Sequence, residues 1–464
     1  MPKYAHNLGV TIYVCGMTPQ DKPHMGHMLA FISADFVRRV LEYFGYEVYH
    51  VQNFTDIDDK VIAKAAALGT DPFRLGEQNI ERYFDAADAV GVKRAHVYPR
   101  VTEHIPDIIG FIASLIDASH AYTANGSVYF DVHSYPAYGE LSRRKIDDLI
   151  AGARVDVEPE KRDALDFALW KAAKEGEPSW NSPWGPGRPG WHIECSAMSV
   201  RYLGSTFDLH GGGSDLLFPH HENELAQSRA LGFKYAKYWF HNGVLNLGGE
   251  KMSKSTGNFF SMEDVFASFS PRVIRFYCLR GHFRKPREFS FERLEESRAA
   301  YERLERTLQH LERTVGQVSE TTRQAGPPQH IEDLVRSTLA QFDERLGDDF
   351  DSEGAIGHMF DFAKKVNTFL TTATPESALD LSALELCRTT LLRMCEILGI
   401  TDARRDSVEI PLAVVELAEE RQKARQRRDF RQSDAIRAQI EDAGFLVEDT
   451  PSGPHVRKKR LNAD

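Results

Sequence analysis

Residues 9–54 alternate between strand and helix patterns, and this arrangement restricts the fold more than any other feature of the chain. GVTIYVC (9–15) and EVYHVQNF (47–54) are rich in β-branched residues and predict two strands. Between them, apolar residues recur three and four positions apart from Leu29 to Phe44, which predicts an amphipathic helix ending at Gly45. A strand–helix–strand unit requires parallel strands joined by a right-handed crossover. We therefore expect a parallel sheet with a ligand site at the carboxyl ends of its strands.

The rest of the chain divides into segments of different periodicity. Residues 60–150 are mostly helical in pattern, with a short strand pair around 127–132, and TFDLHGGGSDLLFPHHENELAQ (206–227) predicts a strand, a glycine turn and a helix. From about residue 290 to 400, apolar residues at helical spacing predict a helical bundle. A helix over 411–444 and a small hairpin are expected at the end of the chain.

The composition is that of a globular protein, with 464 residues of which 42% are hydrophobic and 27% charged. No apolar stretch approaches the roughly 18 residues of a membrane span, and MPKYAHNLG at the N-terminus lacks the apolar core of a signal peptide. We therefore expect a cytoplasmic protein with no membrane partner. Five scattered cysteines indicate thiols or metal ligands, because a disulfide framework needs a denser set.

The net charge of −11 gives no reason to expect a nucleic-acid partner for the chain as a whole. Residues 421–460 differ, because they carry eleven Lys or Arg against six Asp or Glu. Such a segment is either a solvated amphipathic helix with a charged tail or a surface that faces RNA phosphates. On charge alone, the solvated helix is the simpler interpretation.

Two short motifs indicate nucleotide chemistry. HMGH (24–27) begins the first predicted helix, where free N–H groups and the helix dipole favour an anion such as phosphate. KMSKS (251–255) places two lysines in a loop flanked by glycines, from which Lys254 can reach the outer phosphates of ATP. Each motif by itself also fits an ordinary turn or an exposed loop. The two together, at opposite ends of a parallel-sheet domain, are a stronger indication.

As a pair, these motifs resemble the HIGH and KMSKS signatures of class I aminoacyl-tRNA synthetases. Longer strings are similar to cysteinyl-tRNA synthetases, in the order found in that family: YVCG, NFTDIDDK, RPGWHIECSAMS, HGGGSDLLFPHHENE, GEKMSKSTGN and DDFDSEGAIGHMFDFAKKVN. The resemblance covers nearly the whole chain. It implies activation of L-cysteine by ATP, with Mg²⁺ accompanying the nucleotide, and transfer of cysteine to the 3′-terminal adenosine of tRNA(Cys).

The resemblance also implies an α/β architecture with a doubly wound, Rossmann-like parallel sheet, and a monomeric chain. The expected regions are a catalytic domain (1–240) with a connective insertion at about 85–190, a KMSKS loop and stem-contact region (241–290), a helical tRNA-binding bundle (291–402) and a small anticodon-binding domain (403–464). In this arrangement the basic residues between 421 and 437 would face tRNA.

The zinc ligands of the family fall on four residues of the required types: Cys15, Cys195, His220 and Glu224. His220 and Glu224 are four positions apart on a predicted helix, so their side chains share a face, whereas His221 has Leu225 at that spacing. Zinc prefers a thiolate to a neutral hydroxyl and would therefore distinguish cysteine from serine, which a pocket does poorly by shape alone. The implied zinc ion recognises the substrate and is not the catalyst.

The remaining site residues are assigned by matching positions in the family. The implied catalytic residues are His24, His27, Lys251 and Lys254. The implied ATP-binding residues are Gly26, Gly211, Gly212, Gly213 and Lys254. The implied cysteine-binding residues are Gly16, Thr18, Thr55, Trp191 and Asp215. An N-cap role for Asp215 in the following helix is compatible with this assignment, and a glycine run is otherwise simply a turn.

Two other functions share part of this pattern. A cysteine:amino-sugar ligase of the mycothiol type makes the same adenylate, but that family is shorter and does not retain the fourth zinc ligand, which is Glu224 here. A non-catalytic RNA-binding paralogue would not need the intact motifs of this chain. Two segments depart from the family pattern, since CGMTPQD replaces CGPTVYD and HMGHML replaces HIGHAR.

Overall fold

The computed structural model describes residues 9–145, 160–251, 259–317, 326–372, 380–401, 411–427, 429–450 and 453–458. Two compact units form, Met1–Ile400 and Thr401–Asp464. No described helix combines the length and the hydropathy that crossing a membrane requires.

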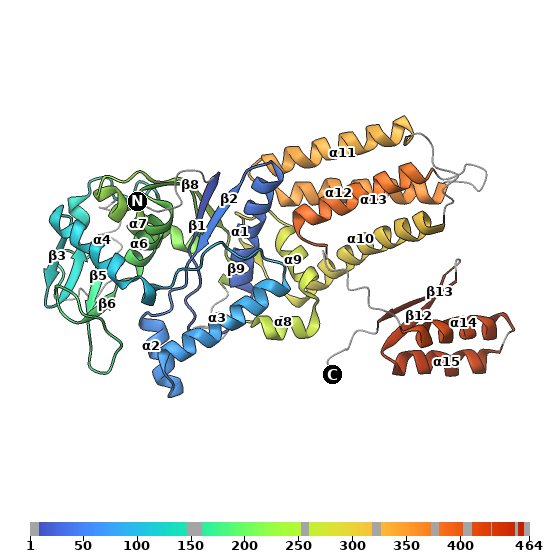
Figure 1. Cartoon of the computed structure of the whole chain (residues 1–464), viewed down its shortest axis with the longest axis horizontal. Helices are drawn as coiled ribbons and strands as arrows, with labels where there is room; N and C mark the ends of the chain where they lie inside the picture. The colour runs from blue at the N-terminus through green and yellow to red at the C-terminus, as the bar shows by residue number, and fades with distance from the viewer. Residues whose placement is uncertain are drawn as a thin grey trace. The chain divides into compact units, whose positions relative to one another are not determined.

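A four-stranded parallel sheet lies at the centre of the first unit, with strand order β2-β1-β7-β8 (Figure 1). The strands are β1 (Val10–Val14), β2 (Val48–Gln52), β7 (Thr206–Gly213) and β8 (Tyr235–Asn242). Helix α1 (Met25–Tyr43) connects β1 to β2, which confirms the strand–helix–strand unit predicted from the sequence. The chain then returns to the other side of β1, so the strand order reverses between β1 and β7. In open α/β sheets, ligands bind in the crevice at this reversal point.

Successive side chains of β1 point to opposite faces of the sheet, so they pack into two different layers of the core. Ile12 and Val14 pack with Val37 of α1, on one face of the sheet. Tyr13 and Cys15 face the opposite layer, which contains α6 (Trp191–Leu203) and α7 (Glu222–Ala230). Residues that line the carboxyl end of β1 are therefore held between two packed layers of helices.

A set of helices and a second sheet lie between β2 and β7 in the sequence. The helices are α2 (Asp59–Leu68), α3 (Pro72–Ala89) and α4 (Ile105–Asp117), with short 3-10 turns at Val101–Glu103 and Val132–Ser134. The second sheet is antiparallel with strand order β3-β4-β5-β6, formed by β3 (Ala121–Ala124), β4 (Ser127–Phe130), β5 (Phe167–Ala172) and β6 (Gly187–Pro189). Residues 176–191 contain the short strand β6 and the start of α6.

After β8 the chain forms a small three-stranded sheet and then the helical bundle. The small sheet consists of β9 (Leu245–Leu247), β10 (Glu250–Lys251) and β11 (Arg287–Glu288), and α8 (Met262–Ser268) and α9 (Pro271–Leu279) lie between β10 and β11 in sequence. The bundle helices are α10 (Phe291–Gln317), α11 (Gln329–Gly347), α12 (Ser352–Thr372) and α13 (Leu381–Leu398), which run alongside one another in Figure 1. Their apolar faces share one core with α1, α3 and α9.

Two predictions about local structure were wrong. The three glycines Gly211–Gly213 do not form a turn but continue β7, paired with Phe240–Asn242 of β8. A Cβ atom on Gly211 would lie 2.0 Å from the Phe240 ring, so only glycine permits this pairing. The helix expected over 411–444 is two helices, α14 (Leu412–Gln426) and α15 (Phe430–Asp442), where Asp429 caps the second. The predicted hairpin is confirmed as β12 (Phe445–Thr450) and β13 (Gly453–Lys458).

Candidate functional site

Four buried donor side chains meet beside the carboxyl end of β1. Cys15 follows β1, Cys195 lies on α6, His220 lies in the π turn Leu217–His221, and Glu224 lies on α7. The Cys15 and Cys195 Sγ atoms are 3.7 Å apart, and Glu224 Oε1 lies 3.4 Å from Cys15 Sγ and 3.1 Å from His220 Nε2. The structure thus brings together all four residues that the sequence predicts as metal ligands.

These donor–donor distances suit a single tetrahedral ion. Two thiolate sulfurs about 2.3 Å from one zinc ion at the tetrahedral angle lie about 3.8 Å apart, and a nitrogen and an oxygen at about 2.0 Å lie about 3.3 Å apart. Two thiols, one imidazole and one carboxylate are also ligands that zinc accepts. The donor set therefore fits a metal ion.

Burial favours the neutral forms of Cys15, Cys195 and His220, whereas Glu224 keeps a lowered pKa. Burial raises the pKa of Cys15 well above its ordinary value, and the hydrogen bond with Cys195 adds to this; burial also raises the pKa of Cys195. Burial lowers the pKa of His220 to about 4, which keeps the imidazole neutral, the form that binds metals. Burial would raise the pKa of Glu224, but His210 and His220 hold it below its ordinary value.

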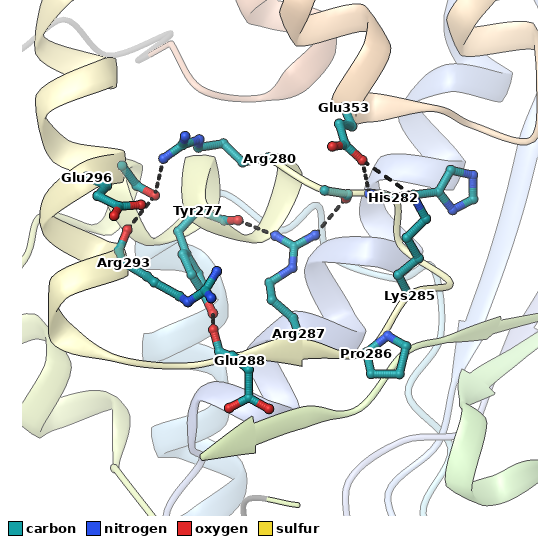
Figure 2. A pocket seen from close by; sticks show the side chains of 12 residues that line it. Tyr277, Arg280, His282, Lys285, Pro286, Arg287, Glu288, Arg293, Glu296 and Glu353 are labelled. Carbon is teal, nitrogen blue, oxygen red and sulfur yellow. Dashed lines mark hydrogen bonds and ion pairs between the residues drawn. The ribbon is translucent and has the colours of Figure 1, made fainter. Parts of the chain in front are cut away.

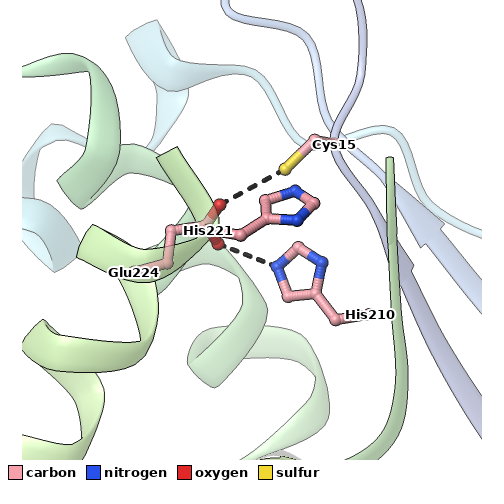
Figure 3. A group of neighbouring side chains, drawn as sticks. All are labelled: Cys15, His210, His221 and Glu224. Carbon is pink, nitrogen blue, oxygen red and sulfur yellow. Dashed lines mark hydrogen bonds and ion pairs between the residues drawn. The ribbon is translucent and has the colours of Figure 1, made fainter. Parts of the chain in front are cut away.

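A second group of four side chains overlaps the first. Cys15, His210, His221 and Glu224 also bring their donor atoms within 4.8 Å of one another (Figure 3). His210 lies in β7, and its Nε2 is 2.8 Å from Glu224 Oε2. His221 Nδ1 is 2.8 Å from His241 Nε2, on β8. The second group therefore shares two residues with the first and adds a histidine network that the sequence did not predict.

Two of the expected cysteine-binding residues lie against this cluster, since Gly16 follows Cys15 in the chain and Trp191 contacts His220. The Trp191 ring stacks on His220 at 4.3 Å between centroids, and the Lys60 ammonium lies 5.5 Å from the Trp191 ring. The Gly16 N–H donates to Asn53 Oδ1 at 2.9 Å, and a Cβ on Gly16 would lie 1.5 Å from the Asn53 carbonyl oxygen, so this close contact requires glycine. The Thr55 hydroxyl is buried and donates to Glu194, and Thr18 lies in the loop after β1.

The HMGH segment forms the N-terminus of α1 with an unusual capping arrangement. His24 Nδ1 accepts the His27 N–H at 3.3 Å and His27 Nδ1 accepts the His24 N–H at 3.4 Å, while the two rings stack at 3.7 Å. Because both Nδ1 atoms accept, the hydrogen of each neutral ring is on Nε2, which is thus a donor. A Cβ on Gly26 would lie 3.0 Å from the His24 ring, so Gly26 leaves room for this stack.

Residues just after the KMSKS segment contact the HMGH segment. The Met25 N–H donates to Phe260 O, the Met262 N–H donates to Pro23 O, and the Phe259 ring stands edge-on to His24. Phe259 and Phe260, which follow the KMSKS segment by a few residues in the sequence, therefore contact the start of the HMGH helix. Lys254 lies outside the described residues, and the side chain of Lys251, at the end of β10, does as well.

The other expected nucleotide and substrate residues lie at the end of β7. The Cys15 N–H donates to Gly211 O at 3.0 Å, which places Gly211, Gly212 and Gly213 directly beside the end of β1. Asp215 lies in the 3-10 turn Ser214–Leu216, whose N-cap is Gly213, so the alternative N-cap role of Asp215 is wrong.

A cavity of about 410 Å³ lies between α9, α10 and the connection from α9 to β11, and none of the expected metal or cysteine-binding residues lines it (Figure 2). Arg280, Lys285 and Arg293 expose their side chains there, while Glu288, Glu296 and Glu353 add carboxylates. The Arg287 guanidinium donates to the carbonyls of Tyr277 and Gly281 and so holds the floor of the cavity together.

Sequence reasoning missed the histidines and the tyrosine around Glu224. His210 and Tyr235 occupy strands whose pattern is typical of ordinary core, and nothing in their spacing marks them. The sequence did indicate one general feature of the site, because the carboxyl ends of parallel strands lie at the same edge of a sheet. Asn53, at the end of β2, accordingly lies beside Gly16.

Comparisons with known proteins agree with this geometry. A family model described as the class I (C) tRNA synthetase catalytic domain matches residues 2–299, and a DALR domain model matches residues 341–402. The structure of Mycobacterium tuberculosis methionyl-tRNA synthetase in complex with methionyl-adenylate shares the fold, with a TM-score of 0.63, 17% identity, and coverage of 84% of this chain and 89% of that chain. The fold and the HMGH helix are those of a class I aminoacyl-tRNA synthetase.

Two relatives make the family more specific. The cysteine–tRNA ligase of Pelotomaculum thermopropionicum is 44% identical over 469 residues, covering 97% of this chain and 96% of the relative. That of Caldicellulosiruptor saccharolyticus is 42% identical over 451 residues, covering 97% of this chain and 95% of the relative. The chain belongs to the cysteine–tRNA ligase family, which confirms the resemblance and the fold class inferred from the sequence.

Proposed function

We propose that this chain activates L-cysteine with ATP and transfers it to the 3′-terminal adenosine of tRNA(Cys). The observation that supports this most directly is the buried cluster of Cys15, Cys195, His220 and Glu224 at the carboxyl end of β1, the strand that precedes the HMGH helix. In this proposal, these four residues would hold a zinc ion that recognises the substrate thiol. When bound, zinc supplies a preference for thiolate over hydroxyl.

In the first step, the cysteine carboxylate attacks the α-phosphorus of ATP. The new bond joins a carboxylate oxygen to phosphorus, the bond to the bridging oxygen breaks, and pyrophosphate leaves. His24 and His27 donate from Nε2 to the transferring phosphate, while Lys251 and Lys254 balance the charge of the departing pyrophosphate, with Mg²⁺ accompanying ATP. Gly26 and the Gly211–Gly213 strand leave room for the nucleotide against the backbone.

The substrate cysteine is oriented by the residues around the cluster. Trp191 forms one wall of the pocket, Asp215 pairs with the substrate ammonium, and Gly16, Thr18 and Thr55 lie near its carboxylate. In the second step, the 2′-hydroxyl of the terminal adenosine attacks the carbonyl carbon of the adenylate, the bond from that carbon to the phosphate oxygen breaks, and AMP leaves as its phosphate accepts the hydroxyl proton. Both steps depend mainly on positioning and electrostatic stabilisation.

The regions beyond the catalytic crevice would hold the tRNA. We assign residues 1–240 with their insertion at about 85–190 to catalysis, 241–290 to the KMSKS loop and stem contact, 291–402 to the tRNA-binding bundle and 403–464 to the anticodon end. The chain acts as a cytoplasmic monomer in this proposal.

The purified chain is expected to exchange pyrophosphate into ATP only when cysteine is present, and serine should not replace cysteine. Lys254→Ala should reduce this exchange by about 10²–10³-fold, the typical effect of removing one donor to developing charge. The exposed Lys234→Ala serves as the matched lysine control and should leave exchange unchanged. Radiolabelled pyrophosphate measures the exchange.

Charging of tRNA separates this function from the related ones. We expect cysteine to be attached to tRNA bearing the cysteine anticodon in the presence of ATP. Exchange without charging would contradict the proposal and favour an amino-sugar acceptor. The absence of both would favour the non-catalytic paralogue.

The exposed side chains of Arg280, Lys285 and Arg293 around the cavity of Figure 2 support a tRNA contact where the stem-contact region meets the bundle. Replacing Lys285 and Arg293 together by alanine is expected to weaken tRNA binding. The slope of log affinity against log salt concentration should also become less steep, by about one for each phosphate that the variant no longer neutralises. Cysteine-dependent exchange should stay unchanged, because the cavity lies outside the catalytic crevice. Lys237→Ala, an exposed lysine on β8, is the control. An unchanged salt slope would contradict this interaction with tRNA.

A further inference from the structure

The two oxygens of the Glu224 carboxylate have separate neighbours. Oε1 lies 3.1 Å from His220 Nε2 and 3.4 Å from Cys15 Sγ, within the proposed ligand group. Oε2 lies 2.8 Å from His210 Nε2 and 2.9 Å from the Tyr235 hydroxyl. An ionised carboxylate only accepts hydrogen bonds, so His210 and Tyr235 both donate to Oε2. One oxygen therefore faces the metal position and the other is held by the protein.

Tyr235 also connects the two helices that carry ligands. Its hydroxyl lies 3.0 Å from the Ser199 hydroxyl, and Ser199 is on α6, one turn after Cys195. The neighbouring Ser196 hydroxyl donates to the Glu224 backbone carbonyl at 3.3 Å. The Tyr235 hydroxyl thus joins the helix of Cys195 to the carboxylate of Glu224 on α7.

The backbone of Tyr235 gives independent support for a special role. Tyr235 is the first residue of β8 and has φ +58°, a left-handed conformation that is unfavourable for a bulky side chain. Its N–H donates to Ser205 O at 2.9 Å, and its side chain is fully buried between Phe207 and His210. A glycine or an asparagine would adopt this backbone more easily. The tyrosine side chain therefore offsets an unfavourable backbone conformation through its own contacts.

We propose that Tyr235, assisted by His210, is a positioning residue for the metal centre. Its hydroxyl fixes the Glu224 carboxylate so that Oε1 alone faces the ion, and it aligns α6 with α7. This inference rests on the ligand assignment in the proposed function. It also gives the overlapping group of Figure 3 a role as support, because the Glu224 oxygen that faces His210 is already hydrogen-bonded to His210 and Tyr235.

The test compares the zinc affinity of three full-length chains without cysteine or ATP. Groups that orient a metal ligand typically contribute 10–100-fold to metal affinity, so Tyr235→Phe should bind zinc about 10–100-fold more weakly than wild type in competition with a chromophoric chelator. Tyr238→Phe is the matched control on the same strand, because its side chain is 67% exposed, and its affinity should be unchanged. Tyr235→Phe should also raise the KM for cysteine and leave the KM for ATP unchanged.

Several outcomes would overturn the inference. Equal zinc affinity in wild type and Tyr235→Phe would show that the hydroxyl does not position Glu224, even if the ligand assignment holds. A wild-type chain that binds no zinc would instead contradict the ligand assignment itself. Loss of zinc in His221→Ala with retention in His220→Ala would identify the group of Figure 3 as the ligand set.

A second variant covers the case in which Tyr235→Phe does not fold. Ser199→Ala removes the hydroxyl that contacts Tyr235 and should weaken zinc binding in the same direction, and unchanged affinity would overturn the inference. The melting temperature is measured with and without zinc for each chain. A merely structural change would lower both values equally, whereas loss of positioning reduces the increase that zinc produces.

Discussion

Asp35→Ala is expected to lower the free energy of unfolding by about 3–5 kcal/mol, the usual cost of leaving a buried charge without its partner. Asp35 on α1 accepts hydrogen bonds from Arg275 on α9 and from Arg39. Arg275 is 1% exposed, so water cannot replace the missing carboxylate. Chemical denaturation followed by circular dichroism measures the loss.

A matched exposed pair provides the control for this prediction. Arg284 and Asp349 also form an ion pair, but their side chains are 41% and 43% exposed. Asp349→Asn should cost less than about 1 kcal/mol, because exposed pairs contribute little. A similarly small loss in Asp35→Ala would contradict the role assigned to the buried pair. Replacing both partners, by Asp35→Leu with Arg275→Met, should recover much of the stability.

The same pair predicts how stability depends on pH. Burial would raise the pKa of Asp35, but Arg275 and Arg39 lower it to about 2. Because this is below the ordinary value of about 3.9, the carboxylate stabilises the fold above pH 4, and this contribution is lost as the pH falls from about 4 to about 2. Asp35→Asn should remove this part of the acid dependence.

The Arg275–Asp35 pair also shows a limit of sequence-based prediction. The apolar periodicity from Leu29 to Phe44 predicted α1, because such a pattern depends only on neighbouring residues. The pairing of Asp35 with a residue 240 positions away depends on how α9 packs against α1, and no local pattern contains that information. Arg275 also donates to the carbonyls of Val90, Gly91 and Leu398, so one buried side chain joins three separate segments.

The metal cluster was predictable for a different reason. The spacing of His220 and Glu224 placed two donors on one face, but only the resemblance to a family linked them to Cys15 and Cys195. The supporting residues His210 and Tyr235 were missed, because their hydrogen bonds to Glu224 come from strands with ordinary patterns. Gly211–Gly213 were wrongly predicted as a turn, since the Phe240 ring that requires a glycine at position 211 lies on another strand.

Cys195→Ser is expected to remove the bound zinc and with it most of the recognition of cysteine. A serine hydroxyl is a much weaker zinc ligand than a thiolate, so the metal content should fall from one zinc per chain to near zero in the isolated protein. The KM for cysteine in pyrophosphate exchange should rise by about 10²-fold or more, as expected when a substrate is deprived of a metal interaction worth several kcal/mol. The KM for ATP should change little, because the HMGH residues that we assign to ATP belong to a different helix.

The comparison of cysteine with serine makes this prediction specific to the metal. Without zinc the pocket can distinguish a thiol from a hydroxyl only by shape. Its preference for cysteine over serine should therefore fall to about 10²-fold or less. Cys387→Ala removes a buried thiol of α13 instead and should retain both the zinc and the preference. A Cys195→Ser chain that still prefers cysteine as strongly as wild type would show that discrimination does not depend on the metal. Cys195 is 1% exposed, so its thiol is buried beside the other three proposed ligands, where the substitution acts on the metal centre directly.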